Sequence, residues 1–156
     1  MNVNKMNITI VLIMSVIVFS AKSQTTLNLY PINNAIGLRF FAEKKFSMET
    51  RIDFQLDLGG GENNIYLNPE IITLMNFWKE QGFQFYAGLG IGASIYNQSE
   101  SQITGSIPIG TSIYFGQQRR IALVGECGVK MMAGSYLKLR SYATVGLQIR
   151  LRKTEN

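Results

Sequence analysis

The sequence predicts an all-β fold: a closed, antiparallel, up-and-down transmembrane β-barrel of eight strands. Apolar and polar residues alternate at a period of two over most of the chain after residue 24, with no convincing helical spacing. Several alternating segments, such as 137–151, exceed the roughly 9 to 11 residues that a tilted strand needs to cross the hydrocarbon layer. Their polar faces are rich in small residues, which suit the narrow interior of an eight-stranded barrel.

Residues 1–23 are expected to be a cleaved signal peptide, and residues 24–156 the outer-membrane β-barrel domain. A polar start precedes an apolar stretch at 8–19, and the small residues Ala21 and Ser23 suit cleavage before residue 24. The alternative is a transmembrane anchor, but the apolar core is about a dozen residues long, and a spanning helix needs roughly 20. The chain is therefore expected to be exported as one domain.

The first four strands are predicted between polar turns. Thr25–Tyr30 is a short alternating segment, and it completes the even number of strands that a closed sheet with both termini on one side needs. Asn34–Phe41 alternates in the same way, and Phe46–Leu58 does so with a single interruption. Ile65–Phe77 is the least regular, so we expect a bulge or a kink near Pro69.

The last four strands follow the same rule. In Phe83–Tyr96 the odd-numbered positions are apolar and the even-numbered ones are Gly, Ser, Gln or Tyr. Ile103–Phe115, Ile121–Met131 and Leu137–Leu151 also alternate, the last two with charged residues on the polar face. An antiparallel sheet with two unlike faces is the structure that this pattern predicts.

The connections between these strands fall into two sets. Three compact charged turns and four polar or Gly-rich loops are expected at opposite rims of the barrel. The turns are centred on 43–45, 79–82 and 116–119, and the loops on 31–33, 59–64, 97–101 and 133–135.

Aromatic residues cluster near these rims. Such rings are typical of the girdles that membrane barrels place at both water boundaries. Ordinary cross-strand aromatic pairs in a soluble sheet are the alternative explanation. The expected membrane-interface aromatics are Phe40, Phe46, Phe77, Trp78, Phe83, Phe85, Phe115, Tyr30 and Tyr136.

The segments FQFYAGLGIGASIY (83–96) and GSIPIGTSIYF (105–115) resemble strands of the small outer-membrane β-barrel proteins of Gram-negative bacteria, the superfamily that includes the OmpA membrane domain, OmpX and OmpW. The resemblance covers essentially the whole chain after the signal peptide. It implies an eight-stranded barrel that contacts outer-membrane lipid.

The inner faces of the expected strands carry both acids and bases. A functional interpretation makes Glu49, Asp53 and Glu126 carboxylates for hydrolysis, or makes the whole set an ion path. A narrow lumen cannot leave charges unpaired, so we expect a structural salt-bridge network that fills it. This network is expected to comprise Arg39, Glu49, Arg51, Asp53, Asp57, Glu126, Lys130, Lys138, Arg140 and Arg150.

The composition excludes several kinds of chemistry. The chain has no His, which removes Ser–His and Cys–His nucleophilic pairs and His-bearing metal sites. The single cysteine, Cys127, cannot form an internal disulfide. Removing residues 1–23 takes two of the 15 basic residues and no acid, which leaves a charge of +3, too mild to indicate nucleic acid.

We therefore expect a non-enzymatic integral outer-membrane barrel with a structural or interaction role, no cofactor, no metal and no catalytic residue. Lipid is its expected partner, together with an unidentified surface or periplasmic protein. The alternatives are a small porin-like pore or hydrophobic-ligand transfer barrel, a soluble periplasmic ligand-binding barrel with its apolar face inward, and a lipid-modifying enzyme that works without imidazole.

Overall fold

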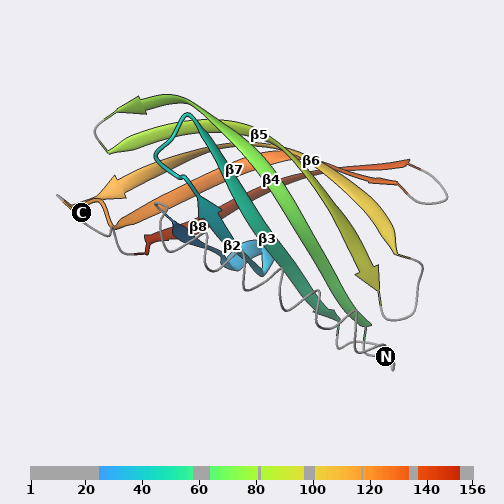
Figure 1. The fold of residues 1–156 in the computed structure, drawn as a ribbon. Coiled ribbons are helices and arrows are strands. Elements are labelled where there is room, and N and C mark those ends of the chain that lie inside the picture. The colour runs from blue at the N-terminus through green and yellow to red at the C-terminus, as the bar shows by residue number, and fades with distance from the viewer. Residues whose placement is uncertain are drawn as a thin grey trace, which may run out of the picture.

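The computed structural model describes residues 25–57, 64–80, 82–96, 101–116, 118–133 and 137–151. Eight antiparallel strands follow one another in chain order around a closed barrel (Figure 1), which confirms the predicted fold class. The elements are β1 (Thr26–Tyr30), the 3-10 turn η1 (Pro31–Asn33), β2 (Ala35–Phe40), β3 (Phe46–Asp57), β4 (Asn64–Glu80), β5 (Phe83–Tyr96), β6 (Gln102–Phe115), β7 (Ile121–Ala133) and β8 (Leu137–Arg150). The predicted signal peptide lies outside the described residues.

Pairing of β1 with β8 closes the barrel. The register runs from Thr26 opposite Arg150 to Leu29 opposite Leu147. The Leu151 amide also donates a hydrogen bond to the Thr25 carbonyl, at 2.9 Å. The short first segment is therefore the eighth strand that closure requires, as its alternation predicts.

Near Pro69 the pairing of β4 with β5 is interrupted at Asn68 and Pro69, but the bulge lies elsewhere. The β4–β5 register is the same before and after Pro69, from Leu67 opposite Ile95 to Glu70 opposite Gly92. A proline lacks the N–H donor but adds no residue, so the strand passes it without slipping. The register shift lies between Asn76 and Trp78, where β4 carries one extra residue.

The two faces of the sheet differ sharply in polarity. Large apolar side chains on the outside are exposed, with Leu89 at 68% and Ile91 at 66%. The inside is lined mainly by buried polar and charged side chains, together with a few apolar ones such as Ile72 and Leu74. Charged residues are almost never fully buried unless they are paired, so the charged side chains inside the barrel are expected to have partners. No helix in the described part of the chain is long and apolar enough to span a membrane.

Glycines on the inner face leave room for large side chains from facing strands. A Cβ added to Gly110 would lie 2.5 Å from the Tyr86 hydroxyl oxygen. A Cβ on Gly146 would lie 2.7 Å from Cδ1 of Tyr30. Because these are far inside contact distance, the small residues are a steric requirement of the filled lumen.

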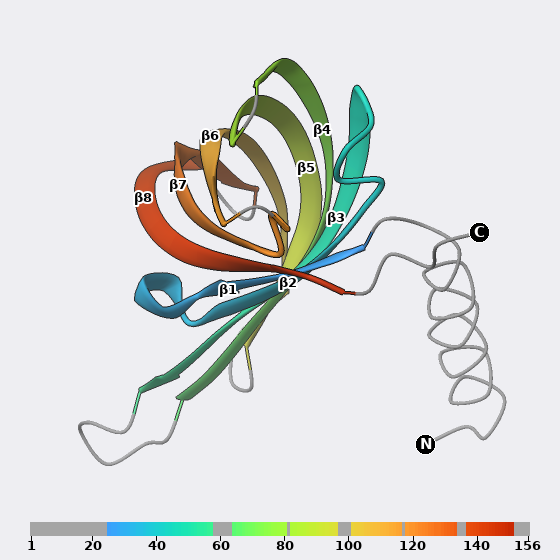
Figure 2. The same cartoon turned by 90° about the vertical axis from the view of Figure 1, so that its left-hand side faces the viewer.

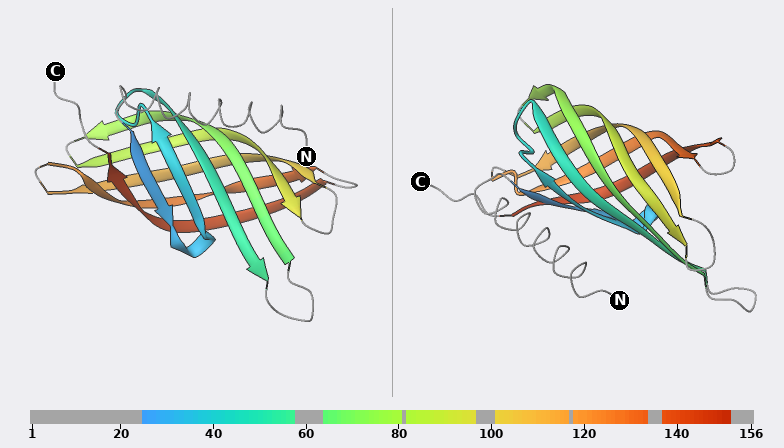
Figure 3. Two further views of the ribbon diagram at one scale, coloured as in Figure 1. Left: turned by 60° about the horizontal axis from the view of Figure 1, so that its bottom comes forward. Right: turned by 45° about the vertical axis from the view of Figure 1, so that its right-hand side comes forward.

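The barrel wall has unequal height at the loop rim. β1 and β2 are 5 and 6 residues long, whereas β3 and β4, which follow, are 12 and 17. η1 therefore lies low between the β3–β4 hairpin and β8 (Figure 2), and the two further views show the same short pair of strands beside β8 and β3 (Figure 3).

Candidate functional site

A buried ion cluster occupies the middle of the lumen. Arg51 of β3 contacts Glu49 from its own strand, with 2.9 Å between Nε and Oε1. The same guanidinium binds Glu126 of β7 through two nitrogens, at 2.7 and 3.0 Å. All three side chains are nearly inaccessible to solvent. A bidentate Arg–carboxylate pair is among the strongest polar contacts in proteins, and here it joins strands on different sides of the barrel.

Three tyrosines complete this cluster. Tyr86 and Tyr142 donate hydrogen bonds to the two oxygens of Glu126, at 3.0 and 3.1 Å. Tyr30 donates to Glu49 at 3.2 Å, and the Arg51 guanidinium stacks over the Tyr30 ring at 4.3 Å. Both carboxylates are thus held by ion pairs and hydrogen bonds within the barrel, which buried charges need.

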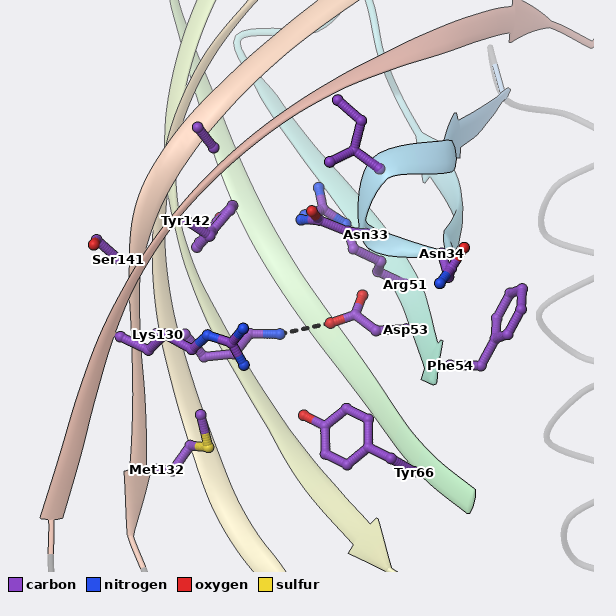
Figure 4. A pocket seen from close by; sticks show the side chains of 13 residues that line it. Asn33, Asn34, Arg51, Asp53, Phe54, Tyr66, Lys130, Met132, Ser141 and Tyr142 are labelled. Atoms are coloured by element: carbon purple, nitrogen blue, oxygen red, sulfur yellow. Dashed lines mark hydrogen bonds and ion pairs between the residues drawn. The ribbon is translucent and has the colours of Figure 1, made fainter. Parts of the chain in front are cut away.

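A second cluster lies closer to the loop rim. Lys130 of β7 contacts Asp53 at 2.7 Å and Glu70 at 3.6 Å, and Figure 4 shows the first of these pairs. Asn68 donates to Asp53 at 3.0 Å, and Ser106 donates to Glu70. This cluster therefore joins β3, β4, β6 and β7 across the lumen.

Neutral groups hold Arg39, near the turn rim. It donates to Ser47 at 3.0 Å and to Asn76 at 2.6 Å, and its guanidinium lies 4.5 Å from the centre of the Tyr86 ring. Arg150 in contrast pairs with Glu43 of the β2–β3 turn, at 2.6 Å. Polar contacts consequently occupy the lumen from the turn rim to the Lys130 cluster.

The structure brings most of the residues expected in the lumen network into these clusters. Lys138 and Arg140 lie instead at the exposed loop end of β8, and the Asp57 side chain is outside the described residues. Sequence reasoning missed Glu70 and Glu43. Glu70 could have been found by counting alternate positions along β4, but Glu43 lies in a turn, where alternation gives no signal.

One of the aromatics expected at the membrane interface does not point outward: Tyr30 is 1% exposed inside the lumen. Phe40 is only 4% exposed, although it shares the parity of the exposed Ile36 and lies opposite the outward-facing Met48. Alternation with Leu27 and Leu29 already places Tyr30 on the inner face. This parity predicts the direction of its side chain better than its closeness to the loop rim does.

The other described aromatics gather beside the turns. Phe46, Phe77, Trp78 and Phe115 are each more than half exposed. The rings of Phe77 and Phe85 stack at 6.1 Å, and the bulge at Asn76–Trp78 turns both Phe77 and Trp78 outward. Tyr136 lies outside the described residues.

A cavity of about 340 Å³ opens above the ion clusters, at the loop rim. Arg51 and Tyr142 line it on the side of the central cluster, and Lys130 and Asp53 line its wall (Figure 4). Arg140 also lines the cavity and lies directly opposite Lys130 in the β7–β8 register. Within the described ranges, no acid lies within ion-pair distance of Arg140.

In the described part of the chain, no three Cys, Asp or Glu side chains are grouped so that they could hold a metal ion. No family model matches the chain, and comparisons with curated proteins and with solved structures find no match either.

Proposed function

We propose that this chain is a non-enzymatic integral outer-membrane β-barrel protein, exported with the signal peptide at residues 1–23, with a structural or interaction role and a lumen filled by side chains. The observation that carries the proposal is the polarity of the barrel, apolar outside and charged inside. Resemblance to small outer-membrane barrels of Gram-negative bacteria in the 83–96 and 105–115 segments points the same way.

The apolar outer surface supports contact with lipid. Burying one large aliphatic or aromatic side chain is worth about 1.5–3 kcal/mol, so a continuous apolar belt exposed to water would be costly. Exposed apolar side chains occur on seven of the eight strands, β2 to β8, for example Ile36, Ile71, Ile109 and Val145. A hydrocarbon layer that surrounds the barrel satisfies this belt, and a closed barrel leaves few backbone groups unpaired in lipid.

The aromatic residues beside the turns support the same placement. Phe46, Phe77, Trp78 and Phe115 are exposed where β3, β4 and β6 meet the turn rim. Flat rings at one end of an apolar belt fit the headgroup region of a bilayer. The turn rim is then one water boundary, and the loop rim lies toward the other.

The polarity weighs against a soluble ligand-binding barrel. That alternative needs an apolar interior, but the interior here holds Arg51, Glu126 and Lys130 in ion pairs. The same packed lumen favours a structural barrel over an enzyme, since the carboxylates considered for hydrolysis are held by arginine, lysine, tyrosine and asparagine.

Cell fractionation tests the proposal. We expect the full-length chain, expressed in a Gram-negative host, to remain in the outer-membrane pellet after washing with alkaline carbonate and to dissolve only in detergent. The extracted protein is expected to be β-rich by circular dichroism and to migrate differently on gels before and after boiling. Recovery as a monomer in the periplasmic fraction without detergent would contradict the proposal.

A further inference from the structure

The wall is low at η1, in the loop half of the barrel, where neither β3 nor β8 has a strand partner on that side. On the β8 side, pairing with β1 ends at Leu147, so Leu137–Val145 have no β1 partner. On the β3 side, pairing with β2 ends at Asp53, and a hydrogen bond of 3.0 Å from the Phe54 amide to the Asn34 carbonyl is the last contact of that ladder. Only η1 stands between the two strands there (Figure 2).

The cavity extends to this gap between β3 and β8. Its lining includes inward-facing side chains such as Asp53 and Tyr142, but also the outward-facing Phe54 and Ala143. Ile32 of η1, which is 65% exposed, lines it at the gap. The cavity is therefore bordered by polar side chains in the lumen and by residues of η1, β3 and β8 at the gap.

Arg140, at the exposed loop end of β8, is the cation of the cavity lining that remains available to a ligand. Arg51 and Lys130 are held by acids, whereas Arg140 has no acidic partner among the described residues. It also lies opposite Lys130 in the β7–β8 register, so the two cations are neighbours on this side of the cavity.

We propose that the cavity binds an amphiphile with one anionic head, a carboxylate or phosphate, and an alkyl chain that leaves over η1 between β3 and β8. Its head contacts Arg140, and its chain lies against Ile32, Phe54 and Ala143. The volume of about 340 Å³ lies within the range of small-ligand sites. The path of the chain rests on the proposed membrane location, because the gap then opens toward lipid.

The probe is 11-(dansylamino)undecanoic acid, titrated by fluorescence into the refolded mature chain in phosphatidylcholine nanodiscs, with empty nanodiscs as background. We expect saturable binding that weakens about tenfold in Arg140→Gln, the size of one charge-assisted hydrogen bond. Arg120→Gln is the matched control, since it removes an exposed arginine at the opposite rim. Its affinity is expected to equal that of the unmodified protein.

Two further measurements test the anionic head and the alkyl chain of the probe separately. The methyl ester of the probe should bind at least tenfold more weakly, and Ala143→Trp, which narrows the gap from outside, should also weaken binding. Equal binding of the ester, or an unchanged affinity in Arg140→Gln, overturns the proposal. Displacement of the probe by acetate or inorganic phosphate at equal concentration also overturns it, because the site would then hold a free anion.

Each variant is first checked for heat-modifiable migration, so that loss of the fold is not read as loss of the site. Fractionation separates this inference from the proposed function. A chain that stays in the outer-membrane pellet but binds no probe contradicts the ligand site alone.

Discussion

At the scale of single residues, the lumen is built from large charged groups and the glycines that face them. Arg51 pairs with both Glu49 and Glu126, and Tyr86 of β5 donates a hydrogen bond to the Glu126 carboxylate. Tyr86 can take this position because Gly110, its partner in the β5–β6 register, has no side chain. Small and large residues on the inner face are thus two parts of one packing arrangement.

This complementarity predicts the effect of adding one methyl group. We expect Gly110→Ala to destabilise the barrel by about 1–3 kcal/mol, because its Cβ would lie 2.5 Å from the Tyr86 hydroxyl. Gly125→Ala is the control, since a Cβ there would lie 3.7 Å from Cγ2 of Thr111, an ordinary contact. The measurement is urea unfolding in micelles, followed by gel mobility. Equal midpoints for the two variants would show that the lumen is not tightly packed.

At the scale of strands, β4 shows how a local insertion serves the outer surface. One extra residue between Asn76 and Trp78 lets two adjacent aromatics, Phe77 and Trp78, both face outward at 55% exposure. Regular alternation would have turned one of them into the lumen. The bulge therefore keeps a bulky ring out of the space that Asn76 and Arg39 share.

The outer face of β5 provides a test at this scale. We expect Leu89→Arg, in the middle of the strand, to destabilise the barrel in phosphatidylcholine vesicles by about 2–4 kcal/mol, because the charge meets hydrocarbon. Leu137→Arg, at the first residue of β8 and equally exposed, should cost only about 0–1 kcal/mol at the rim. Unfolding titrations of both variants provide the comparison. A near-zero effect for both is the behaviour of a water-facing surface.

At the scale of the whole molecule, the barrel is closed by its register and filled by its charges. Contacts such as Arg51–Glu126, between residues 75 positions apart, connect strands that are not neighbours. Ile72 and Leu74 add an apolar block inside the lumen, both with 0% exposure. Ion pairs, hydrogen bonds and apolar contacts thus fill the lumen at the level of Arg51.

The filled lumen predicts the electrical behaviour of the protein. We expect no stepwise conductance after the refolded chain is inserted into planar lipid bilayers, because Arg51, Glu126 and Tyr86 occupy the middle of the lumen. A porin reconstituted in the same way is the positive control for insertion and recording. Reproducible channels from the purified chain would favour the pore alternative instead.

The sequence by itself determines the strands, since alternation at a period of two is a local property that each segment carries independently. It also indicates which face is inside, because glycines and charged residues share one parity. It could have placed Tyr30 and Glu70 inside by the same count. The bulge at Asn76–Trp78 could not be located in this way. Pro69 was the residue that suggested an irregularity in this strand.

Only the tertiary structure decided which charges pair and where the wall is low. The partners of Lys130, namely Asp53 and Glu70, come from β3 and β4, and the register of the closed barrel sets their height. The cavity lies beyond the ends of β1 and β2, because the pairing of β1 with β8 stops at Leu147 and does not reach Arg140. These relations join residues far apart in the chain, and barrel closure fixes them all at once, so no local pattern in the sequence records them.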